Sequence, residues 1–126
     1  MSVTEEPAET PLVGQSVITL DTLSISQIRD LLHKAAYIDA NRKRVAHTCD
    51  GRVLATLFYE PSTRTRLSFE TAMLRLGGQV IGFAGAQLAS VSKGESIADT
   101  LKTVSNYVDV VAIRHPKEGA ALDRKS

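Results

Sequence analysis

The stretch VLATLFYEPSTRTRLSFE, residues 53–70, decides the fold of this chain. Residues 53–59 form an apolar run, which predicts a buried strand. After residue 66, apolar side chains recur at helical spacing, which predicts a helix with one buried stripe. That stripe consists of Phe69, Ala72, Met73 and Leu76. The hydroxyl and guanidinium groups of residues 62–66 therefore lie on a strand-to-helix turn.

The turn at residues 62–66 predicts an anion site. A helix start carries unpaired backbone N–H groups and a partial positive charge. Three hydroxyls and two arginines add donors there, which favours a phosphate as the ligand. The sequence has no GxxxxGK[ST] loop, so side chains as well as backbone would hold the anion. Ser62 and Thr63 have a structural alternative, and we expect one of them to cap the helix.

The two arginines of the turn have different expected roles. Cations at the positive end of a helix oppose its dipole, so each needs a partner or a use. Arg64 and Arg66 are alternate residues whose side chains diverge, so at most one points at a ligand. Arg66 can pair with Glu70 at i+4. We therefore favour Arg64 for the anion and leave Arg66 evenly divided between ligand binding and structure.

Outward from this stretch, helices and strands alternate. Ser24 and Gln27 form a capping box that begins a helix ending near residues 41–44. Further strands are predicted at 80–83 and 110–113, a second helix ends at Gly77-Gly78, and a third covers 96–107. The strands are apolar throughout, as parallel strands covered on both faces are. The predicted fold class is α/β, a three-layer open parallel sheet with helices on both faces.

Polar side chains follow each of the three predicted strands. Residues 62–66 follow the first, Ser90 and Lys93 the second, and Arg114 and His115 the third. In open α/β sheets ligands bind beyond the carboxyl ends of the strands, so all three groups are expected at one edge. Lys93 and His115 could instead be ordinary loop residues without a role in binding. Arg114 directly follows a buried strand and needs a partner.

Composition excludes several classes of function. The 126 residues suit one domain, and 15 Lys and Arg against 14 Asp and Glu lack the basic surplus of a general nucleic-acid or anionic-membrane binder. Cys49 is the only cysteine, which excludes an internal disulfide and favours a reducing, cytoplasmic location. No apolar run approaches the ~18 residues of a membrane span, and the acidic first residues do not resemble a secretion signal.

Three motifs make the chain resemble the aspartate/ornithine carbamoyltransferase family. They are FYEPSTRTRLSFE at 58–70, SVSKGES at 90–96 and RHPKEGAA at 114–121. The first element is shared by both branches of the family, and the other two resemble the aspartate branch. The resemblance runs from about Leu20 to Leu122 and implies the N-terminal, carbamoyl-phosphate-binding half of an aspartate carbamoyltransferase.

The resemblance implies a reaction and a set of residues. Carbamoyl phosphate and L-aspartate would give N-carbamoyl-L-aspartate and phosphate, in de novo pyrimidine synthesis, without cofactor or metal. For Arg66 the resemblance implies a mainly structural role. The implied phosphate ligands are Ser62, Thr63, Arg64 and Thr65. The implied catalytic residues are Arg64, Thr65 and Arg114, with Thr65 and Arg114 approaching the carbamoyl oxygen. Ser90 and Lys93 match a loop that, in the family, reaches the neighbouring subunit of a catalytic trimer. There Ser90 and Lys93 would bind carbamoyl phosphate, and Lys93 would also contact aspartate.

The family pattern ends near Leu122. The next active-site segment of the family, His-Pro-x-Gln, is absent, as is the second domain whose arginines bind aspartate. We therefore predict a disordered leader at 1–14, a partial carbamoyl-phosphate-binding domain at 15–122 and a divergent tail at 123–126. An early stop, a shifted reading frame and a cut chain all explain this ending. We expect little transferase activity from the chain alone. The alternatives are a non-catalytic module that assembles with a full-length catalytic subunit, and a decayed product that barely folds.

Overall fold

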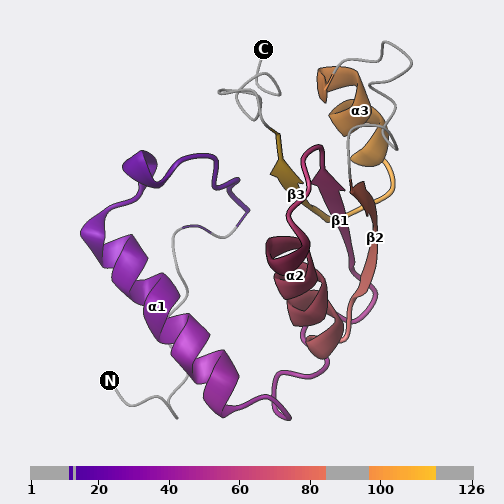
Figure 1. The fold of residues 1–126 in the computed structure, drawn as a ribbon. Helices are drawn as coiled ribbons and strands as arrows, with labels where there is room; N and C mark the ends of the chain where they lie inside the picture. Colours follow the sequence, from indigo (N-terminus) through magenta and orange to yellow (C-terminus); the bar gives the residue numbers. More distant parts are fainter. Residues whose placement is uncertain (1–11, 13, 85–96, 116–126) are drawn as a thin grey trace. The chain divides into compact units, whose positions relative to one another are not determined.

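The computed structural model describes residues 12, 14–84 and 97–115, and the chain divides into two units, Met1–Val45 and Ala46–Ser126. The first unit contains a short 3-10 helix, η1 (Leu20–Thr22), and helix α1 (Ile25–Ala40) (Figure 1). The Ser24 hydroxyl accepts from the Gln27 N–H at 3.1 Å, and the Ser24 N–H donates to the Gln27 side chain at 2.8 Å. The predicted capping box therefore begins α1.

The second unit is built on a parallel sheet. Its strands are β1 (Val53–Phe58), β2 (Gln79–Ala84) and β3 (Val110–Arg114), in the order β2-β1-β3. The central strand is buried from Leu54 to Phe58, as its apolar sequence predicts. The outer side of β3 pairs with no strand among the described residues, and Val110 is 54% exposed.

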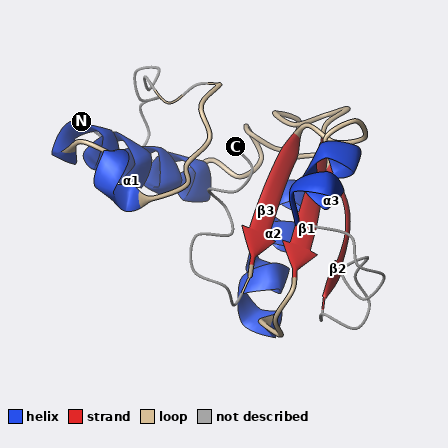
Figure 2. Cartoon of the chain, turned by 90° about the horizontal axis from the view of Figure 1, so that it is seen from above, coloured by secondary structure: helices blue, strands red, loops and turns tan. Residues whose placement is uncertain are grey.

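Helices α2 (Thr63–Arg75) and α3 (Ile97–Val104) cover opposite faces of this sheet. Side chains alternate along a strand, so neighbouring residues of β1 face different helices. Ala55 and Leu57 pack in one cluster with Leu101 of α3, whereas the Thr56 hydroxyl donates to Glu70 of α2. Figure 2 shows the two helices on either side of the strands. The predicted α/β class, with an open parallel sheet and helices on both faces, is confirmed.

The predicted buried stripe of α2 is wrong in phase. Met73 is buried, but Phe69 is 48% exposed and Ala72 is also exposed. The face toward the sheet instead carries Glu70, which follows Phe69 by about 100° around a helix. The reason is the Thr56 hydroxyl, which is fully buried and requires a polar partner. Glu70 supplies it at 2.8 Å and so fixes the rotation of α2.

The end of α2 follows the prediction from its glycines. Gly77 has a φ of 89°, and its N–H donates to Leu74 while the Gly78 N–H donates to Met73. This pair of bonds is a Schellman motif, which ends a helix with a left-handed residue. A Cβ on Gly77 would also overlap the Ala46 carbonyl oxygen, so the position requires glycine for space as well as conformation. Among the described helices, none has both the length and the hydropathy of a membrane-spanning segment.

Candidate functional site

The carboxyl edge of the sheet brings together residues from two distant parts of the chain. Strand β1 leads through Tyr59 and Glu60 into the turn before α2, and β3 ends at Arg114. The register places Phe58 beside Arg114 on one side and beside Ala84 of β2 on the other. The ends of all three strands therefore lie at one level, as predicted from the parallel topology.

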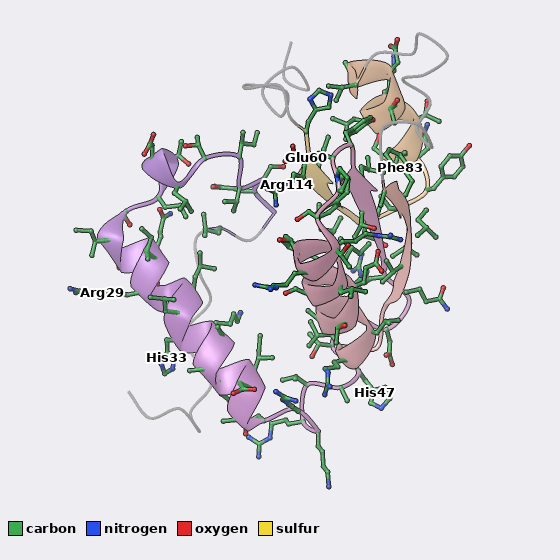
Figure 3. The ribbon with its side chains drawn as sticks, viewed as in Figure 1. Arg29, His33, His47, Glu60, Phe83 and Arg114 are labelled. Carbon is green, nitrogen blue, oxygen red and sulfur yellow. The ribbon has the colours of Figure 1, made fainter. Side chains whose placement is uncertain are left out.

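Arg114 has the partner that its position predicts. Its Nε donates to Glu60 Oε1 at 2.6 Å, and its Nη1 donates to Ser62 Oγ at 2.7 Å. Figure 3 shows Glu60 and Arg114 side by side at the ends of their strands. The Arg114 side chain is 49% exposed, so it remains reachable from solvent while it makes these contacts. The edge thus holds a positioned cation beside the start of α2.

The Ser62 side chain does not cap α2, which was one of the two possibilities predicted for that helix start. Ser62 occupies the residue before α2, but its side chain makes no capping hydrogen bond because its hydroxyl accepts from Arg114 instead. The first bond of the helix runs from the Arg66 N–H to the Ser62 carbonyl. The N–H groups of residues 63–65 therefore lack an intrahelical acceptor. Those donors, together with the helix dipole, suit an anion.

The two arginines of the turn differ in their contacts, and Arg66 makes the ion pair with Glu70 that was one of its two predicted alternatives. Arg66 Nε donates to Glu70 Oε2 at 2.9 Å, and Glu70 also accepts from Thr56. Arg66 therefore has a structural role between α2 and the sheet. Arg64 is exposed and forms no ion pair with any described residue. Its guanidinium is available to a ligand at the same turn.

Of the other predicted site residues, Thr63 and Thr65 lie in the first turn of α2, with Thr65 partly buried. Ser90 and Lys93 lie outside the described residues, so the structure does not place them. His115 follows β3, and its ring lies 4.9 Å from the ring of Tyr59. The edge therefore unites two of the three predicted groups within the described part of the chain.

Sequence reasoning missed Glu60 and Tyr59. Glu60 has a signal in hindsight, since it is the acidic residue nearest a turn that carries two arginines. Tyr59 has none, because it reads as the last residue of an apolar strand. Within residues 14–84 and 97–115, no group of three or more His, Cys, Asp or Glu side chains is arranged to hold a metal ion.

A second arginine–carboxylate pair lies at the amino ends of β1 and β3. Asp109 Oδ2 accepts from the Val53 N–H at 2.9 Å, and Asp109 Oδ1 lies 3.2 Å from Arg52 Nη1. The bond to the Val53 backbone, followed by that to Arg52, lowers the pKa of the Asp109 carboxyl below its ordinary value. This pair joins the same two strands at the opposite end from the candidate site.

Comparison with known proteins gives consistent matches. Residues 15–125 match the family model described as aspartate/ornithine carbamoyltransferase, carbamoyl-P binding domain. The aspartate carbamoyltransferase catalytic subunit of Bifidobacterium longum subsp. infantis is 88% identical over 111 residues, which are 88% of this chain and 35% of that protein. That of Clostridium novyi is 57% identical over 110 residues, covering 87% of this chain and 36% of that protein.

Solved structures agree with these matches. The catalytic subunit of M. jannaschii aspartate transcarbamoylase superposes with a TM-score of 0.80 at 46% identity, over 86% of this chain and 37% of that one. Aspartate transcarbamoylase from Trypanosoma cruzi, in complex with aspartate and phosphate, gives 0.77 at 37% identity, over 87% and 37%. The chain thus spans about a third of the length of the curated relatives it matches.

Proposed function

The chain belongs to the aspartate/ornithine carbamoyltransferase family, and on that premise we propose that it is the carbamoyl-phosphate-binding part of an aspartate carbamoyltransferase. The observation that carries the proposal is the meeting of Arg114 with Ser62 at the start of α2. A cation from β3 lies next to free helix N–H groups that follow β1. Such a site suits a ligand with a phosphate at one end and a polarised carbonyl at the other.

Each group at the edge has a proposed role. Ser62, Thr63, Arg64 and Thr65 bind the phosphate, together with the N–H groups of the first turn of α2. Arg114 and Thr65 bind the carbamoyl oxygen. The Arg114 guanidinium already donates to Ser62 at the start of α2. A rotation of the Arg114 side chain is therefore enough to bring it to a ligand at that helix start. These roles follow from the family motif and are supported by the exposure of Arg64 and Arg114.

The chemistry suits a site built from donors and cations. The aspartate amine attacks the carbamoyl carbon, and an N–C bond forms. The C–O bond to phosphate breaks, its electron pair leaves with the phosphate, and the amine loses a proton. Positioning both substrates and stabilising charge on the carbonyl oxygen and the leaving phosphate lower the barrier. No covalent bond to the protein and no metal is required.

The proposal also covers the longer protein, since this chain is similar to only one part of its relatives. Lys93 and Ser90 serve the active site of a neighbouring subunit in a homotrimer, with Lys93 contacting both substrates. The aspartate ligands lie in the second domain of the family, so residues 1–126 alone give negligible turnover. A cytoplasmic location accords with the single cysteine.

A second candidate is a non-catalytic module that assembles with a full-length catalytic subunit. The observation that favours it is the exposed apolar surface of the second unit. Phe69 and two leucines of α2 are exposed, as is Val110 on β3. The leucines are Leu67 and Leu74. Co-purification of the chain with a complete catalytic subunit, without gain of carbamoyl aspartate production, would favour this candidate.

Calorimetric titration with carbamoyl phosphate and with inorganic phosphate tests the first candidate. We expect both to bind, and Arg64→Ala to weaken binding about tenfold. Arg75→Ala is the matched control, since it removes an equal charge from the other end of the same helix. Equal affinity of wild type and Arg64→Ala would remove Arg64 from the role. If neither carbamoyl phosphate nor inorganic phosphate bound detectably, the proposal would be overturned.

A further inference from the structure

Tyr59 lies at the centre of the carboxyl edge, directly after β1. It is 3% exposed, and its ring contacts residues at the ends of both neighbouring strands. The ring of Phe83 on β2 meets it edge-on, with centroids 5.1 Å apart. The ring of His115, the residue after β3, lies 4.9 Å away at 58°. One side chain therefore connects the ends of β2, β1 and β3.

The backbone of Tyr59 also holds Arg114. Its N–H donates to the Arg114 carbonyl at 2.9 Å, one residue beyond the last paired residues of β1 and β3. Strand β3 has β1 as its only paired neighbour within the described ranges, so this bond and the ring contact secure its end. An aromatic contact of this kind stabilises the folded state beyond the contribution from burial of the ring alone.

The geometry places Tyr59 behind the anion site. Arg114 pairs with Phe58, so its side chain lies on the face of α2, where it meets Ser62. Tyr59 packs in the cluster on the face of α3, and His115 contacts it there. The peptide between Arg114 and His115 is thus held from one face while the guanidinium projects from the other. Placement of a guanidinium on a small anion tolerates only a fraction of an ångström of error.

The hydroxyl of Tyr59 is not part of this arrangement. It is buried and makes no hydrogen bond with any residue that the structure describes. A buried hydroxyl without a partner destabilises the folded state. The contribution of Tyr59 to the edge therefore comes from its ring and its backbone N–H.

We propose that Tyr59 is a positioning residue, whose ring holds the Arg114–His115 segment so that the Arg114 guanidinium reaches a phosphate-bearing ligand at the start of α2. The inference rests on the proposed function and deepens it. It predicts different consequences for loss of the ring and loss of the hydroxyl.

Titration of the whole 126-residue chain with inorganic phosphate tests the inference. We expect Tyr59→Phe to bind as wild type and Tyr59→Leu to bind about fivefold more weakly. Leu101→Val is the matched control, because Leu101 packs in the same cluster but lies on α3. It should lower the melting temperature and leave the affinity unchanged. If Tyr59→Leu does not fold, His115→Ala removes the other half of the ring contact and should weaken binding about threefold.

A double-mutant cycle with Arg114→Ala supplies a readout that general destabilisation would not move. If Tyr59 acts through Arg114, Tyr59→Leu has no further effect on phosphate affinity once Arg114 is alanine. Equal affinity of wild type, Tyr59→Leu and His115→Ala would overturn the inference and leave the proposed function intact. So would an equal loss in Tyr59→Phe and Tyr59→Leu, which would assign the effect to the hydroxyl. Failure of wild type to bind phosphate would overturn both.

Discussion

Among the residues that the structure describes, two arginine–carboxylate pairs join β1 to β3, one at each end of the sheet, and they are built differently. At the amino end, Asp109 accepts from the Val53 backbone N–H as well as lying near Arg52. At the carboxyl end, the Arg114 guanidinium donates to the side chains of Glu60 and Ser62, and it makes no bond to a backbone group of the described residues. The bond from the Val53 N–H ties the Asp109 carboxylate to the backbone of the neighbouring strand, whereas the side-chain contacts of Arg114 can be exchanged for a ligand. The amino-end pair is structural, and the carboxyl-end pair is suited to binding.

The largest effect should come from a change at the middle of the sheet, which disturbs β1 between its two ends. Gly82 in β2 has a φ of 150°, and a Cβ there would overlap the Thr56 carbonyl oxygen of β1. Gly82→Ala should therefore destabilise the sheet by about 3 kcal/mol, measured by denaturant unfolding. Gly51→Ala is the control, because Gly51 also has positive φ but no atom near the added Cβ. It should cost roughly 1 kcal/mol. Equal losses would show that conformation alone, without the clash, accounts for the effect.

The next effect separates the two ends. Arg114→Ala should weaken phosphate binding by about 10- to 100-fold, because the site loses a charge-assisted donor. Arg52→Ala removes the same charge at the amino end and should leave the affinity unchanged. Calorimetry on the two variants side by side makes the comparison. Similar losses in both would mean that net charge, rather than position, determines binding.

A smaller effect should sharpen the account of the carboxyl end. Under the proposed function Glu60 would compete with the anion for Arg114, since its carboxylate lies 2.6 Å from Arg114 Nε. Glu60→Gln should therefore raise phosphate affinity by about two- to fivefold, the range of an exposed ion pair. Glu70→Gln is unsuitable as a control because Glu70 holds α2 against the sheet. Asp39→Asn, which frees Arg42 in the first unit, is suitable and should have no effect. A fall in affinity for Glu60→Gln would show that Glu60 helps to hold the anion-binding geometry.

The smallest effect concerns the amino end and depends on pH. The pKa of Asp109 is lowered in the folded protein, so its contribution to stability is present above the unfolded pKa. It is lost as the pH falls through the folded pKa, when the carboxyl binds its proton. The difference in melting temperature between wild type and Asp109→Asn should therefore be present at pH 7 and vanish in strong acid. Phosphate affinity should be the same for both at pH 7.

The elements of the fold were predictable because they depend on local signals. Apolar runs gave the three strands, the Ser24–Gln27 box gave the start of α1, and Gly77 gave the end of α2. Two predictions failed where a distant residue intervenes. Thr56 turns α2 so that Phe69 faces outward, and Arg114 takes the hydroxyl of Ser62, one of the two residues expected to cap the helix.

Part of the candidate site was also predictable, because general rules of topology and helix spacing apply to it. The topology rule placed Arg114 near residues 62–66, and the i+4 spacing predicted the pairing of Arg66 with Glu70. Glu60 and Tyr59 were missed because their roles depend on Arg114 at the end of β3 and on His115 after it. Only Glu60 has a local signal, which is its closeness to the two arginines of the turn. The roles of Ser90 and Lys93 remain predictions.

The bond between Arg114 and Ser62 joins residues 52 apart in the sequence, and this separation bears on the order of folding. Strands β1 and β2, with α2 between them, form from nearer neighbours, whereas β3 docks only after a longer loop closes. Long-range pairings form late because their loop entropy is lost before their contacts form. We therefore expect the proposed anion site to be among the last features to assemble. A phosphate bound at the start of α2, as we propose, would stabilise only the chains in which β3 has docked, and would therefore favour completion of folding.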